Sequence, residues 1–134
     1  LKSARPELTV ILNGGIGSVE QGAALLEDFD GVMLGRAAYG EPAILAQVDR
    51  LIFGSQSADP DPIDVARQMI PYVERMAEQG VPSHQIVRHM LGLMHGRPGA
   101  RKWRRMLSER GASTPSNIIQ LALAELKSVV VAPA

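Results

Sequence analysis

Two short apolar runs near the start of the chain end in residues that could bind an anion. The runs are LTVIL at residues 8–12 and GVML at residues 31–34. The residues that follow them are Asn13, Gly14 and Gly15 after the first run, and Gly35 and Arg36 after the second. Glycine lacks a Cβ, so its N–H can approach a ligand closely and its φ can be positive, while the arginine can bond two phosphate oxygens at once. The two turns therefore predict a phosphate-binding corner, although Asn-Gly and Gly-Gly are also ordinary turn sequences.

A second group of candidate residues is basic and lies in GRPGARKWRRMLSERG, residues 96–111. On a helix of about 100° per residue, four bases share one arc and the apolar residues fall on the opposite side. These bases are Arg101, Lys102, Arg104 and Arg105. A solvated helix face usually mixes charges of both signs, whereas a face that is nearly all positive is typical of contact with phosphate backbones. The helix is therefore predicted to bind RNA, with a solvated face as the alternative.

Other residues bear on this basic face. Arg88 and Arg97 could widen it, with His89 beside Arg88. Trp103 lies on the apolar side and is predicted to anchor a helical core rather than to stack on a base. The predicted RNA-binding residues are Arg88, Arg97, Arg101, Lys102, Arg104 and Arg105.

No metal site is predicted. His84, His89 and His95 are separated by five and six residues, so they do not stack on one helical face, and no acidic residue lies nearby in sequence. The chain has no cysteine, which excludes disulfides, thiolate metal sites and a cysteine nucleophile or acid within these 134 residues.

The elements that must position these residues are of two kinds. The two apolar runs are predicted strands, and residues 18–29 and 42–54 are predicted helices, which together give the βαβα pattern of a parallel sheet covered by helices. The polar stretch SQSADPDP at residues 55–62 is a predicted linker. Beyond it, amphipathic helices are predicted at 63–79, at 84–95, at 100–110 and from STPSN to about Val130. Four such helices indicate a small bundle.

Composition and charge fit a soluble globular chain whose halves differ. Of the 134 residues, 46% are hydrophobic and 21% charged. Residues 1–62 contain four basic and nine acidic side chains, whereas residues 63–134 contain ten and five, which suggests two segments with different partners. No apolar run approaches the length of a membrane span, and LKSARPEL is not a signal peptide. We expect a cytoplasmic protein with no membrane partner.

The sequence around these motifs resembles a known family. LTVILNGGIGSVEQ and DGVMLGRAAYGEPAILAQVDRLIFG resemble the end of the barrel of bacterial tRNA-dihydrouridine synthases of the A subfamily, and HMLGLMHGRPGARKWRRMLSE resembles their C-terminal helical domain. The resemblance covers roughly residues 7–127. It implies an α/β plus all-α fold, in which residues 1–55 form the last βαβα part of a (β/α)₈ TIM barrel. Residues 56–62 would then be a linker, and 63–134 a small four-helix bundle that binds tRNA.

The resemblance also implies a reaction and a cofactor. In that family FMN lies in the barrel, and its phosphate position corresponds here to Asn13, Gly14, Gly15, Gly35 and Arg36. NADPH is the reductant, and a D-loop uridine of tRNA, at position 20 or 20a, is reduced to dihydrouridine. Hydride goes to C6, and a cysteine on an earlier barrel loop protonates C5.

Some of the family's functional residues have no counterpart in this chain. That cysteine is absent, as are the lysine and histidine used near the flavin. Because two strands alone do not make a stable sheet, we expect a C-terminal fragment that is inactive by itself and self-associates through its exposed barrel remnant. Two alternatives stay open. One is a non-catalytic RNA-binding helical module, and the other is a different phosphate-binding flavin barrel that acts on a small molecule.

Overall fold

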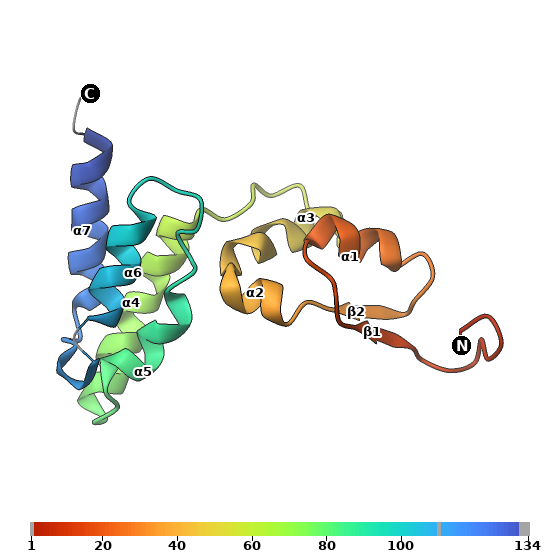
Figure 1. Ribbon diagram of the computed structural model, residues 1–134, viewed down its shortest axis with the longest axis horizontal. Helices are drawn as coiled ribbons and strands as arrows, with labels where there is room; N and C mark the ends of the chain where they lie inside the picture. The colour runs from red at the N-terminus through yellow and green to blue at the C-terminus, as the bar shows by residue number, and fades with distance from the viewer. Residues whose placement is uncertain (1, 110, 132–134) are drawn as a thin grey trace. The chain divides into compact units, whose positions relative to one another are not determined.

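The computed structural model describes residues 2–109 and 111–131 and divides the chain into two compact units (Figure 1). The first unit is Leu1–Asp59 and the second is Pro60–Ala134. The first contains both strands, and the second contains only helices and turns among its described residues. No helix among the described residues is both long and apolar enough to cross a bilayer.

The first unit is built on a parallel βαβ motif, as predicted. Strand β1 (Ile11–Asn13) pairs in parallel with β2 (Gly31–Met33), and helix α1 (Val19–Leu25) connects them. Ser18 caps α1, because its side chain accepts a hydrogen bond of 3.2 Å from the N–H of Gln21. A Cβ on Gly22 of α1 would lie 3.3 Å from Val32 Cγ2, so α1 packs closely against one face of the sheet.

The rest of the first unit differs in part from the prediction. A short helix α2 (Arg36–Gly40), which was not predicted, follows β2. The predicted helix at 42–54 consists of a 3₁₀ helix η1 (Pro42–Gln47) and a single α-helical turn α3 (Val48–Leu51). Pro42 begins this segment, as expected of a residue that has no N–H to lose. Helical structure ends at Leu51, short of the predicted end just before Gly54.

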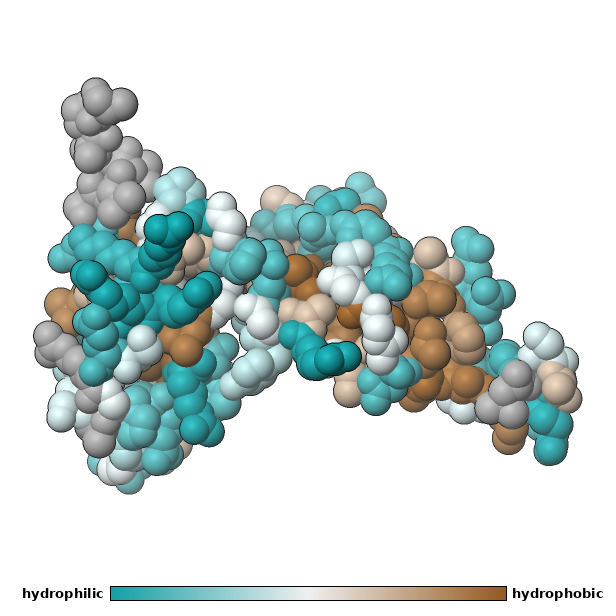
Figure 2. Space-filling model, in the orientation of Figure 1, coloured by the Kyte–Doolittle hydropathy of each residue, from teal (hydrophilic) through white to brown (hydrophobic). Residues whose placement is uncertain are grey.

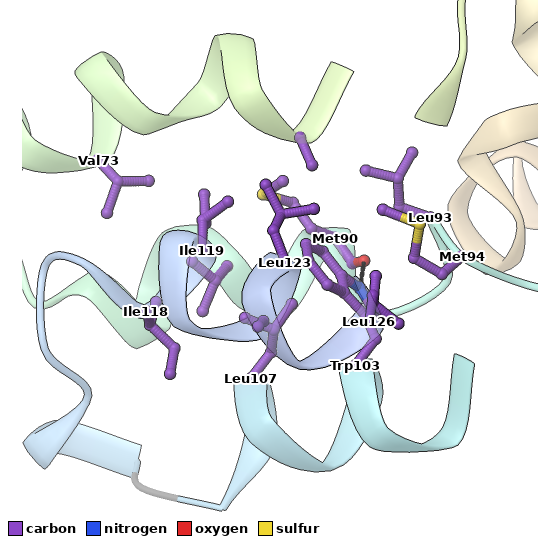
Figure 3. Close-up of a cluster of buried hydrophobic side chains, with 13 residues drawn as sticks. Val73, Met90, Leu93, Met94, Trp103, Leu107, Ile118, Ile119, Leu123 and Leu126 are labelled. Atoms are coloured by element: carbon purple, nitrogen blue, oxygen red, sulfur yellow. Dashed lines mark hydrogen bonds between the residues drawn. The ribbon is translucent and has the colours of Figure 1, made fainter. Parts of the chain in front are cut away.

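The second unit consists of helices around one hydrophobic core. Its elements are α4 (Pro62–Glu78), α5 (Ser83–Val87), the 3₁₀ helix η2 (Arg88–Met90), α6 (Ala100–Ser108), the 3₁₀ helix η3 (Gly111–Ser113) and α7 (Ile118–Val131). Figure 3 shows side chains from α4, α6, α7 and the α5–α6 segment converging in this core. Trp103 is fully buried there, and its indole N–H donates to the Met90 carbonyl at 2.9 Å. The predicted role of Trp103 as core anchor is confirmed.

The predicted helix at 84–95 is wrong in its second half. Helix α5 ends at Val87, and after η2 the chain continues in turns to Gly99. The backbone hydrogen bonds in this stretch, such as Leu93 N–H to Met90 carbonyl and Arg97 N–H to Met94 carbonyl, span three residues rather than four. The tight turns bring Met90, Leu93 and Met94 into the core, where all three are buried. An uninterrupted α-helix would distribute these side chains differently around its axis.

Candidate functional site

The predicted phosphate-binding residues line one pocket in the first unit. A hollow of about 390 Å³ opens at the carboxyl ends of β1 and β2. All five predicted residues line it, together with Ile16, Gly17, Met33 and Ala37. Asn13 and Met33 are paired in the sheet as the last residues of their strands, so the parallel register places the two turns side by side.

The first turn of the pocket depends on two glycines with positive φ. Gly14 has φ 113° and Gly15 has φ 74°, and a Cβ built on either would meet nothing within 4 Å. Other residues rarely adopt these backbone angles, so conformation rather than crowding requires glycine here. The open space beside both residues leaves their backbone accessible to a ligand.

The second turn supplies the charge. Arg36 is exposed at the first position of α2 and lines the pocket. Within residues 2–109 and 111–131 it forms no ion pair or side-chain hydrogen bond. None of the nine lining residues is acidic. A guanidinium, an asparagine side chain and accessible glycine backbone suit an anion such as a phosphate group.

The predicted RNA-binding residues lie in the second unit, and α6 carries four of them. Arg101 and Arg104 are exposed, and neither has an ion-pair partner among the residues that the structure describes. Arg105 is also exposed, and its Nε lies 3.4 Å from a carboxylate oxygen of Glu109, the residue that follows α6. These three arginines can therefore bind an anionic ligand with little loss of other interactions, because an exposed ion pair such as Arg105–Glu109 is weak.

Lys102 is used differently from its neighbours on α6. It is half-buried and forms an ion pair with Glu125 of α7. The hydrogen bond and charge of Lys102 hold the pKa of the Glu125 carboxyl below its usual value. Lys102 therefore links α6 to α7 across their packed faces.

The two predicted residues outside α6 also differ from each other. Arg88 is exposed on η2, and its Nε donates to His89 Nε2 at 3.2 Å. Arg97 instead forms a two-pronged ion pair with Asp61, with Nη1–Oδ1 2.9 Å and Nη2–Oδ2 2.7 Å. The bonds from Arg97 hold the pKa of Asp61 below its usual value, assisted by the backbone N–H of Ile63.

The sequence interpretation missed both acidic partners, Asp61 and Glu125. Asp61 caps α4, since its Oδ1 accepts a bond of 2.7 Å from the N–H of Ile63. The sequence Asp-Pro before an apolar run is a recognisable helix start, so the cap could have been found. The pairing with Arg97 could not, because 36 residues separate the partners.

Comparison with known proteins gives a consistent result over nearly the whole chain. The model of the family described as "Dihydrouridine synthase (Dus)" matches residues 1–128. Proteins named tRNA-dihydrouridine(20/20a) synthase are 53% identical over 125 residues in Escherichia coli strain K12, 50% identical over 125 residues in Salmonella typhi and 41% identical over 128 residues in Vibrio cholerae. These alignments cover 92–94% of this chain. The chain spans only 36–39% of the length of these relatives.

Proposed function

The chain belongs to the dihydrouridine synthase family, and on this premise we propose that it is the C-terminal part of a flavin-dependent enzyme that reduces uridine 20 or 20a of tRNA. The observation that carries the proposal is its identity of 50% or more over 125 residues to relatives named tRNA-dihydrouridine(20/20a) synthase. In this proposal residues 1–55 belong to a TIM barrel and residues 63–134 form the tRNA-binding domain.

The pocket of the first unit supports FMN as the flavin. Asn13, Gly14, Gly15, Gly35 and Arg36 would hold its phosphate group, since they combine accessible backbone with a cation that is unpaired among the described residues, and with no acid. FMN would supply hydride for the reduction of the uracil ring, with NADPH as the reductant. The residues of this chain would bind and orient the cofactor.

The chain would not supply the proton for the reaction. The family resemblance assigns that step to a cysteine on an earlier barrel loop, and this sequence contains no cysteine. We therefore propose that these 134 residues bind cofactor phosphate and RNA without catalysing the reaction alone. The pocket favours this interpretation over a purely RNA-binding module, and the basic face of α6 favours it over a flavoenzyme for small molecules.

The RNA-binding part of the proposal is tested by reversing two charges on α6. Arg101→Glu with Arg104→Glu should weaken binding of an unmodified tRNA transcript more than tenfold at moderate salt, because both side chains are exposed and have no ion-pair partner in the described part of the chain. The slope of log affinity against log salt concentration should also decrease in size by about 0.7 to 0.9 for each phosphate that the variant no longer neutralises.

The matched control carries the same change of charge on another helix of the same unit. Arg67→Glu with Arg75→Glu alters two exposed arginines of α4. Circular dichroism should show that both double variants keep their helical content. Equal weakening by the two double variants would mean that net charge alone governs binding, and unchanged binding by the α6 variant would remove α6 from the RNA interface.

A further inference from the structure

The ion pair between Arg97 and Asp61 connects the start of one helix to the start of another. Asp61 precedes α4 and caps it through the N–H of Ile63. The guanidinium of Arg97 bonds both oxygens of the same carboxylate. The Asp61 carboxylate thus accepts a hydrogen bond from the first turn of α4. It also holds the side chain of Arg97, which lies in the turn that leads into α6.

The main chain of Arg97 is in turn bonded to the start of α6. Gly99, at the position before that helix, has no side chain that could cap it. The N–H of Ala100, the first residue of α6, instead donates to the carbonyl of Arg97 at 3.1 Å. A displacement of Arg97 would therefore free an N–H at the helix start, where such groups need partners.

The first turns of α6 carry the charges that are available to a ligand. Arg101 is the second residue of the helix and Arg104 lies one turn later. Both are exposed and unpaired among the described residues, whereas Arg97 has both terminal nitrogens on Asp61. Arg97 must break its two-pronged bond to Asp61 before it can form such a bond with a phosphate group.

We propose that Arg97 and Asp61 act as a positioning pair, which fixes the first turn of α6 so that Arg101 and Arg104 meet the RNA backbone, and that Arg97 does not itself bind phosphate. This inference rests on the proposed function of the second unit as an RNA-binding domain. It revises the role that the sequence alone suggests for Arg97. In this proposal Asp61 supports RNA binding, although it is an acid beside a basic surface.

The two roles of Arg97 predict opposite effects of removing the acid. Asp61→Asn keeps a side chain that caps helices well but loses the ion pair. If Asp61 helps to fix the first turn of α6, this variant should bind an unmodified tRNA transcript three- to tenfold more weakly than the wild-type chain does. If Arg97 bound phosphate, the variant would free it, and binding would stay the same or become tighter.

A control for the lost negative charge lies in the same helical turn. Asp64→Asn removes an exposed acid that pairs with Arg67 within α4 and, among the residues that the structure describes, has no bond to α6. Its tRNA affinity should be unchanged or slightly increased. Weaker binding by Asp61→Asn alone would support the pair, and equal behaviour of the two variants would overturn it.

Substitutions of Arg97 give a second test. Arg97→Ala should weaken binding without changing its salt dependence, because the same number of phosphates is neutralised. Arg97→Lys keeps the charge but cannot form the two-pronged bond, so it should lose nearly as much affinity as alanine. A salt slope reduced by about 0.7 to 0.9 in Arg97→Ala, together with full affinity in Arg97→Lys, would overturn the proposal.

A measurement without RNA separates this inference from the proposed function. Amide hydrogen exchange at Ala100 should be faster in Asp61→Asn than in the wild-type chain and unchanged in Asp64→Asn. Unchanged exchange in Asp61→Asn would overturn the positioning pair even if tRNA binds. Failure of the wild-type chain to bind tRNA would overturn the proposed function and the pair's role in it, whatever the exchange rates.

Discussion

At the scale of single residues, Arg36 is the only cationic side chain among those that line the pocket. We predict that the chain binds FMN in about the millimolar range, or about 4 kcal/mol, because only the phosphate end of a flavin site is present. Arg36→Ala should weaken this binding severalfold, and inorganic phosphate should compete for the variant severalfold more weakly than for wild type. Titration followed by quenching of flavin fluorescence measures both effects.

The control for Arg36 is Arg50, which pairs with Asp59 away from the pocket. Arg50→Ala should leave FMN affinity unchanged. Micromolar affinity of the wild-type chain would contradict the prediction, because it would require contacts to the flavin ring. Equal affinity of Arg36→Ala and wild type would show that Arg36 does not bind the phosphate.

Gly99 combines two constraints that can be separated by mutation. It has φ 85°, and an added Cβ would lie 2.5 Å from Leu126 Cδ2 of α7. Gly96 in the same turn has φ 72° but open space around it. Gly96→Ala should cost about 1–2 kcal/mol in the free energy of unfolding from backbone strain alone. Gly99→Ala should cost more, because Leu126 must also move.

Urea unfolding followed by circular dichroism gives both free energies. If the two glycine variants lose equal stability, the end of the Leu126 side chain moves aside freely, and close packing of α6 on α7 does not depend on Gly99.

At the scale of elements, the sequence predicted the regular segments and missed what interrupts them. The β1–α1–β2 motif and helix α4 follow from apolar periodicity, which the sequence displays directly, and the two helices begin after caps at Ser18 and Asp61. The 3₁₀ segments within 42–54 and 84–95 were missed, because apolar spacing does not distinguish a helix from successive tight turns. Bonds between distant segments, such as that between Trp103 and Met90, become visible only in the folded chain.

The same limit applies to the candidate site. Periodicity located all the bases of α6 on one arc, and the strand ends located the pocket residues, because both arguments need only local geometry. Arg97 and Lys102 are already paired with Asp61 and Glu125, which lie at the start of α4 and in α7. Sequence reasoning therefore predicted the composition of the basic face but not the division of roles within it.

The start of α4 should make the stability of the second unit depend on pH. Hydrogen bonds from Arg97 and Ile63 lower the pKa of Asp61 below its ordinary 3.8. A lowered pKa means that the stabilisation is complete above the ordinary value and is lost as pH falls through the lower value of the folded state. Asp61→Asn should therefore be less stable than wild type at neutral pH, and the difference should shrink below pH 3.8.

Urea unfolding of both proteins across an acid pH series measures this difference, with Asp64→Asn as the control. A difference that stays constant down to strongly acid pH would mean that Asp61 stabilises α4 as a neutral cap and that the charge of the pair contributes nothing.

At the scale of the whole molecule, the sheet of the first unit has one covered face and one open face. Side chains on successive strand residues alternate between faces, and Val32 faces α1. Ile11 and Met33 lie on the opposite face, 63% and 45% exposed. Figure 2 shows apolar surface, in brown, around the strands of the first unit. An apolar sheet face of this kind attracts other apolar surfaces.

We predict that the 134-residue chain self-associates through this open face and through the unpaired strand edges at tens of micromolar. Ile11→Thr with Met33→Thr should shift the chain toward monomer, because threonine keeps the preference for strands but removes apolar area from the face. Leu121→Thr is the control, since Leu121 is 41% exposed on α7 of the other unit and should leave the association unchanged. Sedimentation equilibrium over a concentration series distinguishes these outcomes. A wild-type chain that stays monomeric throughout, or a Leu121 variant that dissociates as much as the double variant, would show that the open sheet face does not drive assembly.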